Sequence, residues 1–372
     1  SNIGGIFIGA ESFSQKLCWN LEKPSAPSNP LAGTDGALLC DCPAGTVYNQ
    51  DVGQGTSCAW KCPSGTSYVI SDAGTAGCIS QQSNVSAELR FSSETLRLAV
   101  VWFSNDPGGA TSAYGDISSW DVSLLTTMRG AFENLPNFNG DVAAWNVSRV
   151  TDMSRMFYGA SAFDRDLSAW DVSLVTTMEY MFKGASAFDR DLSSWDTSRV
   201  VKMREMFRSA SSFNGNISSW DVSQVTTMQS MFHYATSFNR DLSSWDVSKV
   251  GSMLEMFRAA SSLVDGGLSA WDVSNVQQMG EMFYDCHKFN GDISSWDVSN
   301  VQSMFQMFYN ARSFDRDLSS WDVSKVSNIG GIFIGAESFS QKLCWNLEKP
   351  SAPSNPLAGT DGALLCDCPA GT

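Results

Sequence analysis

From Ile117 onward, the chain repeats a 25-residue unit that carries one tryptophan. The tryptophans of successive units are Trp120, Trp145, Trp170, Trp195, Trp220, Trp245, Trp271, Trp296 and Trp321. Only the step from Trp245 to Trp271 is one residue longer, and Gly266 and Gly267 can absorb this residue in a turn. A fixed period of about 20 to 30 residues predicts a solenoid, in which each coil buries its apolar side against its neighbours.

Two apolar spacings within the unit predict how one coil folds. In L-x-x-W-x-V, tryptophan and valine flank an aspartate, as Trp170 and Val172 flank Asp171, which predicts a short strand with one buried face. In M-x-x-M-F-x-x-A, the apolar residues recur at i, i+3, i+4 and i+7, which predicts one face of a short helix. In one unit these residues are Met178, Met181, Phe182 and Ala185. We therefore expect a strand, a turn, a short helix and a return in each coil.

A second, longer period is superimposed on the first, because residues 1–46 recur letter for letter as residues 327–372. The simplest interpretation is one period, plus an overlap, of a longer tandem array; the alternative is a single unit with a duplicated tail. Residues 1–22 would then be the end of a preceding solenoid. The predicted segments that follow are a Pro/Ser/Gly linker (23–39), a disulfide-rich module (40–78), a helical N-terminal cap (79–111), the solenoid of nine coils with a C-terminal cap (112–348), and a linker with the start of the next cysteine module (349–372). In the N-terminal cap, Ser93 is expected to cap a helix that Asp106-Pro107-Gly108-Gly109 ends.

The repeats and the stretch before them resemble a known family. The stretch reads L-R-L-A-V-V-W-F-S-N-D-P, and the coils read V-T-x-M-x-x-M-F-x-x-A-x-x-F-N/D-x-D-L-S-S-W-D-V-S. From Glu88 to Lys349, this pattern resembles the BspA-like leucine-rich-repeat surface proteins. The resemblance implies a leucine-rich-repeat-like solenoid of short parallel strands and short helices. It also implies a non-enzymatic protein of the cell surface, used in adhesion or in surface coats, and it assigns no catalytic or binding residue.

Six cysteines cluster between Cys18 and Cys78 among glycine, proline and serine residues, which is typical of a disulfide module from an oxidising compartment. The motif C-P-x-G-T occurs twice, and it is similar to the small cysteine repeats of ephrin-receptor-like and tumour-necrosis-factor-receptor-like ectodomains. Each copy is followed by one further cysteine at the same spacing, so repeat symmetry favours one pairing among the 15 that six cysteines allow. The predicted bridges are Cys18–Cys40, Cys42–Cys58, Cys62–Cys78 and, in the repeated segment, Cys344–Cys366. We therefore expect an extracellular protein.

Charge narrows the range of partners. The formal net charge is −15, which argues against nucleic acid and anionic membrane surfaces as partners, and the absence of a long apolar run argues against membrane insertion. Aspartates follow eight of the nine tryptophans of the units and could bind Ca²⁺, although aspartate in this position also caps turns through backbone N–H groups. The weak Ca²⁺ candidates are Asp171, Asp196, Asp221 and Asp246, and no other metal or cofactor is expected. Sequons at Asn84, Asn146 and Asn216 predict covalently attached glycans.

No catalytic constellation is visible, because the two histidines, His233 and His287, lie in different coils and at different positions. We therefore expect a structural module of a filament-forming surface protein rather than an enzyme. Self-association head to tail would bury the apolar residues of the first segment on a preceding coil. These residues are Ile3, Ile6, Phe7, Phe13, Leu17 and Trp19. The alternative is an adhesin or receptor that binds a protein or a glycan on the concave face of the solenoid.

Overall fold

The computed structural model describes residues 91–343 and Trp345 in full, and the backbone of four short strands before them. The chain divides into two compact units, Ser1–Ser86 and Ala87–Thr372. In the first unit, β1 (Val47–Tyr48) pairs antiparallel with β2 (Cys58–Ala59), and β3 (Thr66–Ile70) pairs antiparallel with β4 (Ala76–Ser80). Both hairpins lie in the segment for which we predict a disulfide-rich module (40–78), except that β4 ends two residues beyond it.

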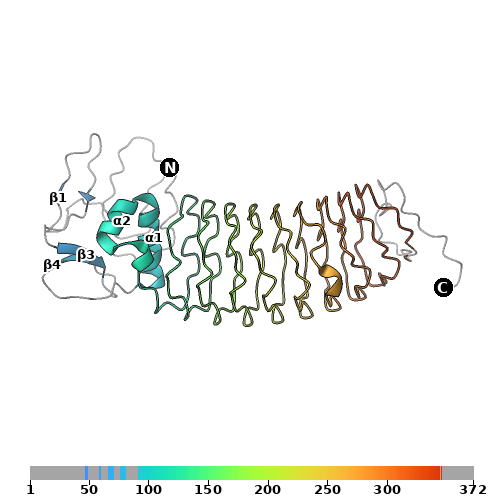
Figure 1. Ribbon diagram of the computed structural model, residues 1–372, viewed down its shortest axis with the longest axis horizontal. Helices are drawn as coiled ribbons and strands as arrows, with labels where there is room; N and C mark the ends of the chain where they lie inside the picture. The colour runs from blue at the N-terminus through green and yellow to red at the C-terminus, as the bar shows by residue number, and fades with distance from the viewer. Residues whose placement is uncertain are drawn as a thin grey trace, which may run out of the picture. The chain divides into compact units, whose positions relative to one another are not determined.

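The second unit begins with two helices, which lie at one end of a stack of coils (Figure 1). Helix α1 (Ser93–Asn105) is capped by Ser92, whose side chain accepts a hydrogen bond from the Thr95 N–H. The helix lies in the predicted segment, but its cap and its first residue each come one position earlier than expected. Asp106 ends α1 but also caps a second helix, α2 (Pro107–Tyr114), which the sequence did not reveal.

The predicted strands and helices of the coils are wrong. Between residues 115 and 343, the only regular elements are two single turns of 3-10 helix, η1 (Ile117–Ser119) and η2 (Leu268–Ala270). Neighbouring coils are joined by isolated parallel bridges, one residue per coil, such as Thr177 to Lys202. The leucine-rich-repeat-like solenoid of short parallel strands and short helices is thus corrected to a stack of turns, without an extended sheet or an α-helix in the coils.

Consecutive turns explain why the M-x-x-M-F-x-x-A segment looked helical. In the coil that begins at Trp170, the N–H groups of Met181 and Ala185 donate to the carbonyls three residues before them, at 3.1 and 3.0 Å. The N–H groups of Phe182 and Gly184 donate instead to the next coil, to Met206 O at 2.9 Å and to Arg208 O at 2.8 Å. Turns with i to i+3 hydrogen bonds bring the same residues to one side as a helix does, so the apolar spacing does not distinguish the two structures.

Each pair of turns needs a residue with positive φ, and this need is met mostly without glycine. Between residues 115 and 343, thirteen non-glycine residues have positive φ, among them Arg155 (57°), Tyr180 (61°) and Glu205 (53°). This backbone conformation is unfavourable for most side chains. Here the cost is offset because the N–H of the same residue pairs with the next coil, as the Arg155 N–H does with Glu179 O at 2.9 Å.

The core of the stack consists of aromatic columns that run from coil to coil. The indole rings of Trp195, Trp220 and Trp245 stack with centroids 6.1 and 6.4 Å apart and interplanar angles of 2°. Phenylalanine columns lie beside them, with Phe182 and Phe207 at 5.6 Å. Every tryptophan, methionine and phenylalanine of the repeat consensus is buried within the described coils, as the sequence predicted.

Helix α1 covers the first coil and satisfies its backbone. The Ser93 hydroxyl donates to Thr127 O at 3.2 Å, and the Arg97 guanidinium donates to the carbonyls of Ala131 and Glu133. In later coils, the equivalent carbonyls accept hydrogen bonds from N–H groups of the coil before. The helix therefore replaces a missing neighbour through two side chains, and burial lowers the pKa of Arg97.

Candidate functional surfaces

One edge of the stack is formed by the D-L-S-S-W-D-V-S segments, which contain the predicted Ca²⁺ candidates. In each candidate, a carboxylate oxygen accepts a hydrogen bond from the N–H two residues later. Asp171 accepts from Ser173, Asp196 from Ser198, Asp221 from Ser223 and Asp246 from Ser248, at 2.9 to 3.0 Å. These aspartates stabilise turns. Among residues 91–343 and 345, no three Asp, Glu, His or Cys side chains are placed to hold a metal ion.

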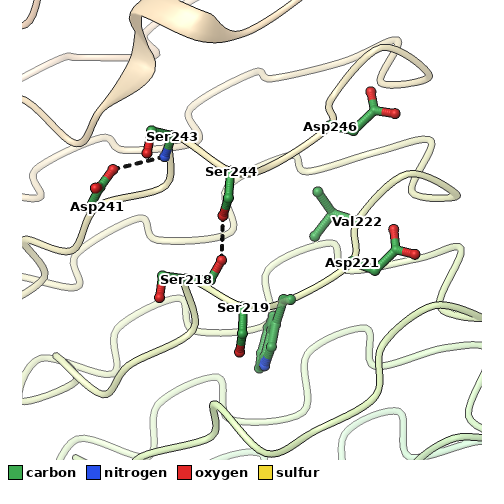
Figure 2. A pocket seen from close by; sticks show the side chains of 9 residues that line it. Ser218, Ser219, Asp221, Val222, Asp241, Ser243, Ser244 and Asp246 are labelled. Atoms are coloured by element: carbon green, nitrogen blue, oxygen red, sulfur yellow. Dashed lines mark hydrogen bonds between the residues drawn. The ribbon is translucent and has the colours of Figure 1, made fainter.

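An open groove of about 590 Å³ interrupts this edge between two coils. It contains three carboxylates, Asp221, Asp241 and Asp246, together with the four serines Ser218, Ser219, Ser243 and Ser244. Figure 2 shows Asp221 and Asp246 in neighbouring coils, and Asp241 as the acceptor of the Ser243 N–H. We call this site the acidic groove. Two glycines with positive φ, Gly266 and Gly267, follow it where the repeat is one residue longer.

Two of the three predicted glycosylation sites lie in this edge. Asn146 and Asn216 occupy positions held by aspartate in other coils, and their side-chain oxygens accept from the Ser148 and Ser218 N–H groups at 3.2 and 3.1 Å. Asn146 is exposed and Asn216 is half-buried. Asparagine therefore stabilises the same turn as aspartate but without a charge, and glycosylation of either residue stays a prediction. Asn84 lies outside the described residues.

A second surface is formed by the four x positions of M-x-x-M-F-x-x-A. Every tyrosine between residues 115 and 343 lies at one of them, and so do many charged residues. The five tyrosines are Tyr158, Tyr180, Tyr234, Tyr284 and Tyr309. We call this surface the variable face, because its residues differ between coils whereas the rest of the unit is nearly constant. Sequence reasoning missed it, although variation between copies of the repeat was the available signal.

A cation cluster lies on the N-terminal half of the variable face. The Glu205 carboxylate is buried and is surrounded by three cations, Lys183, Arg204 and Arg208, at 2.6, 3.4 and 3.3 Å. Despite its desolvation, which acts in the opposite direction, these cations lower the pKa of Glu205. Arg155 lies 5.6 Å from the centre of the Tyr158 ring. We use the term cation cluster for Arg155, Lys183, Arg204 and Arg208.

The C-terminal half of the variable face is more aromatic. Tyr284 and Tyr309 stack at 4.5 Å, and Arg258 lies 4.2 Å from the centre of the Tyr284 ring while it also pairs with Glu281. His233 is buried between coils, with Nδ1 3.0 Å from Glu255 Oε2. Burial and the neighbouring Arg208 lower the pKa of His233 to about 4, although Glu255 acts in the opposite direction. The imidazole is therefore neutral at pH 7.

The other predicted sites lie outside the described residues or have no visible role in chemistry. Nothing described bears on the side chains of the predicted disulfides Cys18–Cys40, Cys42–Cys58, Cys62–Cys78 and Cys344–Cys366, or on the predicted assembly residues Ile3, Ile6, Phe7, Phe13, Leu17 and Trp19. Cys286, which stands in an alanine column, is a buried free thiol that donates to Phe257 O at 2.8 Å. Among the described residues, no helix is both long enough and apolar enough to cross a membrane.

The repeats define a tandem-repeat protein. Residues 103–200, 189–267 and 262–360 match the family described as "Mycoplasma protein of unknown function, DUF285", and the chain belongs to this family. The three matches follow one another along the coils, so the family's unit comprises several of the 25-residue repeats. Among curated proteins and among solved structures, none matches the chain.

Proposed function

We propose that this protein is a structural module of an extracellular, tandem-repeat surface protein, in which stacks of coils are joined head to tail. One observation carries the proposal: the repeated segment extends the core of the stack. Trp345 stacks on Trp321 at 6.2 Å, and Phe339 lies 6.0 Å from Phe314. Residues 327–343 and Trp345 therefore continue the stack of coils, which supports the tandem-array interpretation of the repeated segment.

The same letters occur at residues 1–22, which supports an equivalent packing there. The core residues of the repeated segment are Ile329, Ile332, Phe333, Phe339, Leu343 and Trp345, and all are 6 % exposed or less. They correspond one to one to Ile3, Ile6, Phe7, Phe13, Leu17 and Trp19. We infer that residues 1–22 also pack on the end of a stack, because burying each large apolar side chain is worth about 1.5 to 3 kcal/mol.

Three further features support a structural role at a surface. The serine and aspartate side chains of the constant edge are engaged in turn hydrogen bonds, which favours scaffolding over catalysis. The resemblance to BspA-like surface proteins and the clustered cysteines favour an extracellular location. Binding of a protein or a glycan remains the alternative, and the variable face, rather than any concave strand face, is the observation that favours it.

The experiment compares the full chain with a variant that ends at Val326. That variant lacks the repeated segment, so the coil that contains Trp321 is uncovered while residues 1–22 are kept. We expect residues 1–22 of one molecule to cover this coil in another, which generates head-to-tail polymers. At about 1 M salt, which screens lateral charge contacts, electron microscopy and sedimentation velocity should show end-to-end filaments for the shortened chain and none for the full chain.

The matched control adds Phe7→Asp and Phe13→Asp to the shortened chain. The equivalent residues Phe333 and Phe339 are 0 % and 1 % exposed, so a charge at these positions is expected to prevent packing and filament growth. A shortened chain that stays monomeric, or a control that polymerises equally well, would contradict the proposal.

A further inference from the structure

We propose that the cation cluster of one molecule docks into the acidic groove of a second copy of the same chain, so that stacks associate side by side. This contact goes beyond the proposed end-to-end joining and needs none of residues 1–22. The occupant of each surface is therefore another copy of this protein, recognised through charge complementarity and a shared spacing of coils.

The cation cluster carries uncompensated positive charge on a strongly acidic protein. Three cations share the single carboxylate of Glu205, which leaves an excess of two positive charges around it. The side chains of Arg204 and Arg155 are each 41 % exposed, so both are accessible to a partner, although Arg155 also pairs with Glu133 at 3.1 Å. Against a net charge of −15, such a patch attracts an anionic surface and orients it.

The acidic groove supplies the complementary surface. Its carboxylates Asp221, Asp241 and Asp246 are exposed, and none of them forms an ion pair with a cation within the described part of the chain. The groove is open, and its serine hydroxyls add acceptors between the carboxylates. A guanidinium or ammonium group from another molecule would gain charge-assisted hydrogen bonds there, which are stronger than neutral ones.

Both surfaces repeat with the same step, and this sets the register of the contact. Lys183 and Arg208 occupy equivalent positions of two consecutive coils, 25 residues apart, and so do Asp221 and Asp246. Because every coil is displaced from the next by one backbone ladder, charges on the two surfaces have matching spacing. A cluster and a groove on different sides of the repeat make a heterologous contact, which extends into an open lateral assembly.

A glycan fits the cation cluster less well. Sugars bind on the free faces of aromatic rings, but Arg155 and Lys183 lie 5.2 and 5.4 Å from the centre of the Tyr180 ring. Tyr158 has the same two cations at 5.6 and 5.5 Å. The tyrosines therefore hold the cations in place and are not open platforms.

Sedimentation velocity of the full chain tests the contact, with two sets of substitutions. The first, D221N/D241N/D246N, removes the groove charges but keeps the turns, because the chain itself has asparagine at the equivalent positions Asn146 and Asn216. The second, R155Q/R204Q, leaves Lys183 and Arg208 on the buried Glu205. We expect salt-sensitive association of the unmodified chain, weakened about tenfold or more by either set.

Mixing the two variants gives the decisive result. Each variant keeps one intact surface, so the mixture should form a 1:1 complex that neither variant forms alone. About 1 M salt, at which the screening length is about 3 Å, should dissociate this complex.

The control D297N/D317N/D322N removes the same number of charges elsewhere on the edge and should associate like the unmodified chain. Thermal melting checks that all variants are folded. A monomeric unmodified chain, salt-insensitive association, or a mixture without a complex would each overturn the proposal. Deleting residues 1–22 should leave the lateral contact intact, which separates its failure from that of end-to-end joining.

Discussion

Replacing Trp220 tests whether the tryptophan column holds the coils together. Its indole is 2 % exposed, stacks on Trp195 and Trp245, and packs against Phe207 at 6.1 Å. Its Nε1 donates to the carbonyl of Leu192 in the preceding coil at 2.9 Å. Trp220→Ala removes both stacks, the hydrogen bond and most of the side-chain volume, so we expect a loss of about 3 to 5 kcal/mol in the free energy of unfolding.

Trp220→Phe separates the ring from the hydrogen bond. The smaller ring keeps the column continuous but cannot donate to Leu192 O, which still accepts from the Trp195 N–H at 3.1 Å. The lost hydrogen bond is worth about 1 kcal/mol, and the smaller ring adds a packing loss, so the total should be about 1 to 2 kcal/mol. Leu124→Ala, at a side chain that is 47 % exposed, serves as the control and should change the free energy by less than about 0.5 kcal/mol.

Urea unfolding measures these energies, and hydrogen exchange locates them. Faster exchange in Trp220→Ala should be greatest in the two adjoining coils, because contacts in a repeat array are made with nearest neighbours. If Trp220→Ala costs less than about 1 kcal/mol, or if the phenylalanine variant is as unstable as the alanine variant, stacking of the indoles is not what holds adjacent coils together.

Three further outcomes follow from the titrating groups. The free energy of unfolding should fall as the pH drops from 6.5 to about 4, because His233 is protonated in this range in the unfolded chain but not in the folded chain. His233→Gln should remove this part of the dependence of the free energy on pH. An NMR titration of the imidazole should give the low pKa directly. Hydrogen bonds from Ser248 lower the pKa of Asp246 in the folded chain, so the carboxylate contributes its full stability above the unfolded-state pKa and loses it as the pH falls through the folded-state pKa. Asp246→Asn should remove this pH dependence and melt within a few degrees of the parent at pH 7. Asp246→Ala should lose about 1 kcal/mol in the free energy of unfolding. Burial raises the pKa of the Cys286 thiol, so the thiol should react with thiol reagents only after urea unfolding. Cys286→Ala should melt like the parent. Rapid modification of the native chain would contradict the burial of Cys286.

The repeat predicted which residues are buried but not how the backbone runs between them. The positions of Trp170, Met178 and Phe182 in the core follow from the pattern, because turns and helices place residues three and four apart on the same side. What distinguishes the two is the sign of φ at residues such as Tyr180, and tyrosine gives no hint of a positive φ. The strand was inferred from the alternation of Trp170 and Val172, yet both residues end or begin turns.

The candidate surfaces were less visible in the sequence. The aspartate column was recognised, but the groove at Asp241 depends on how neighbouring coils are spaced, which no single unit reveals. The shared partner of three cations, Glu205, could not be found because its contacts come from two coils whose relative rotation depends on the turns. Helix α2 was missed because Asp106-Pro107 both ends one helix and starts another.

The hydrogen bonds between coils all point the same way along the M-x-x-M-F-x-x-A segments, and this gives the stack a polarity. N–H groups donate toward the C-terminal neighbour, as from Met178 to Lys202 O and from Met304 to Asn328 O. The aligned peptide dipoles place partial negative charge at the carbonyls of the first coil, where the Arg97 guanidinium neutralises it. Helix α1 covers this N-terminal end of the stack. An added segment can therefore accept hydrogen bonds through its carbonyl groups only at the C-terminal end. A stack of this kind can be lengthened in one direction only, and two stacks that lie side by side gain electrostatically when their dipoles are antiparallel.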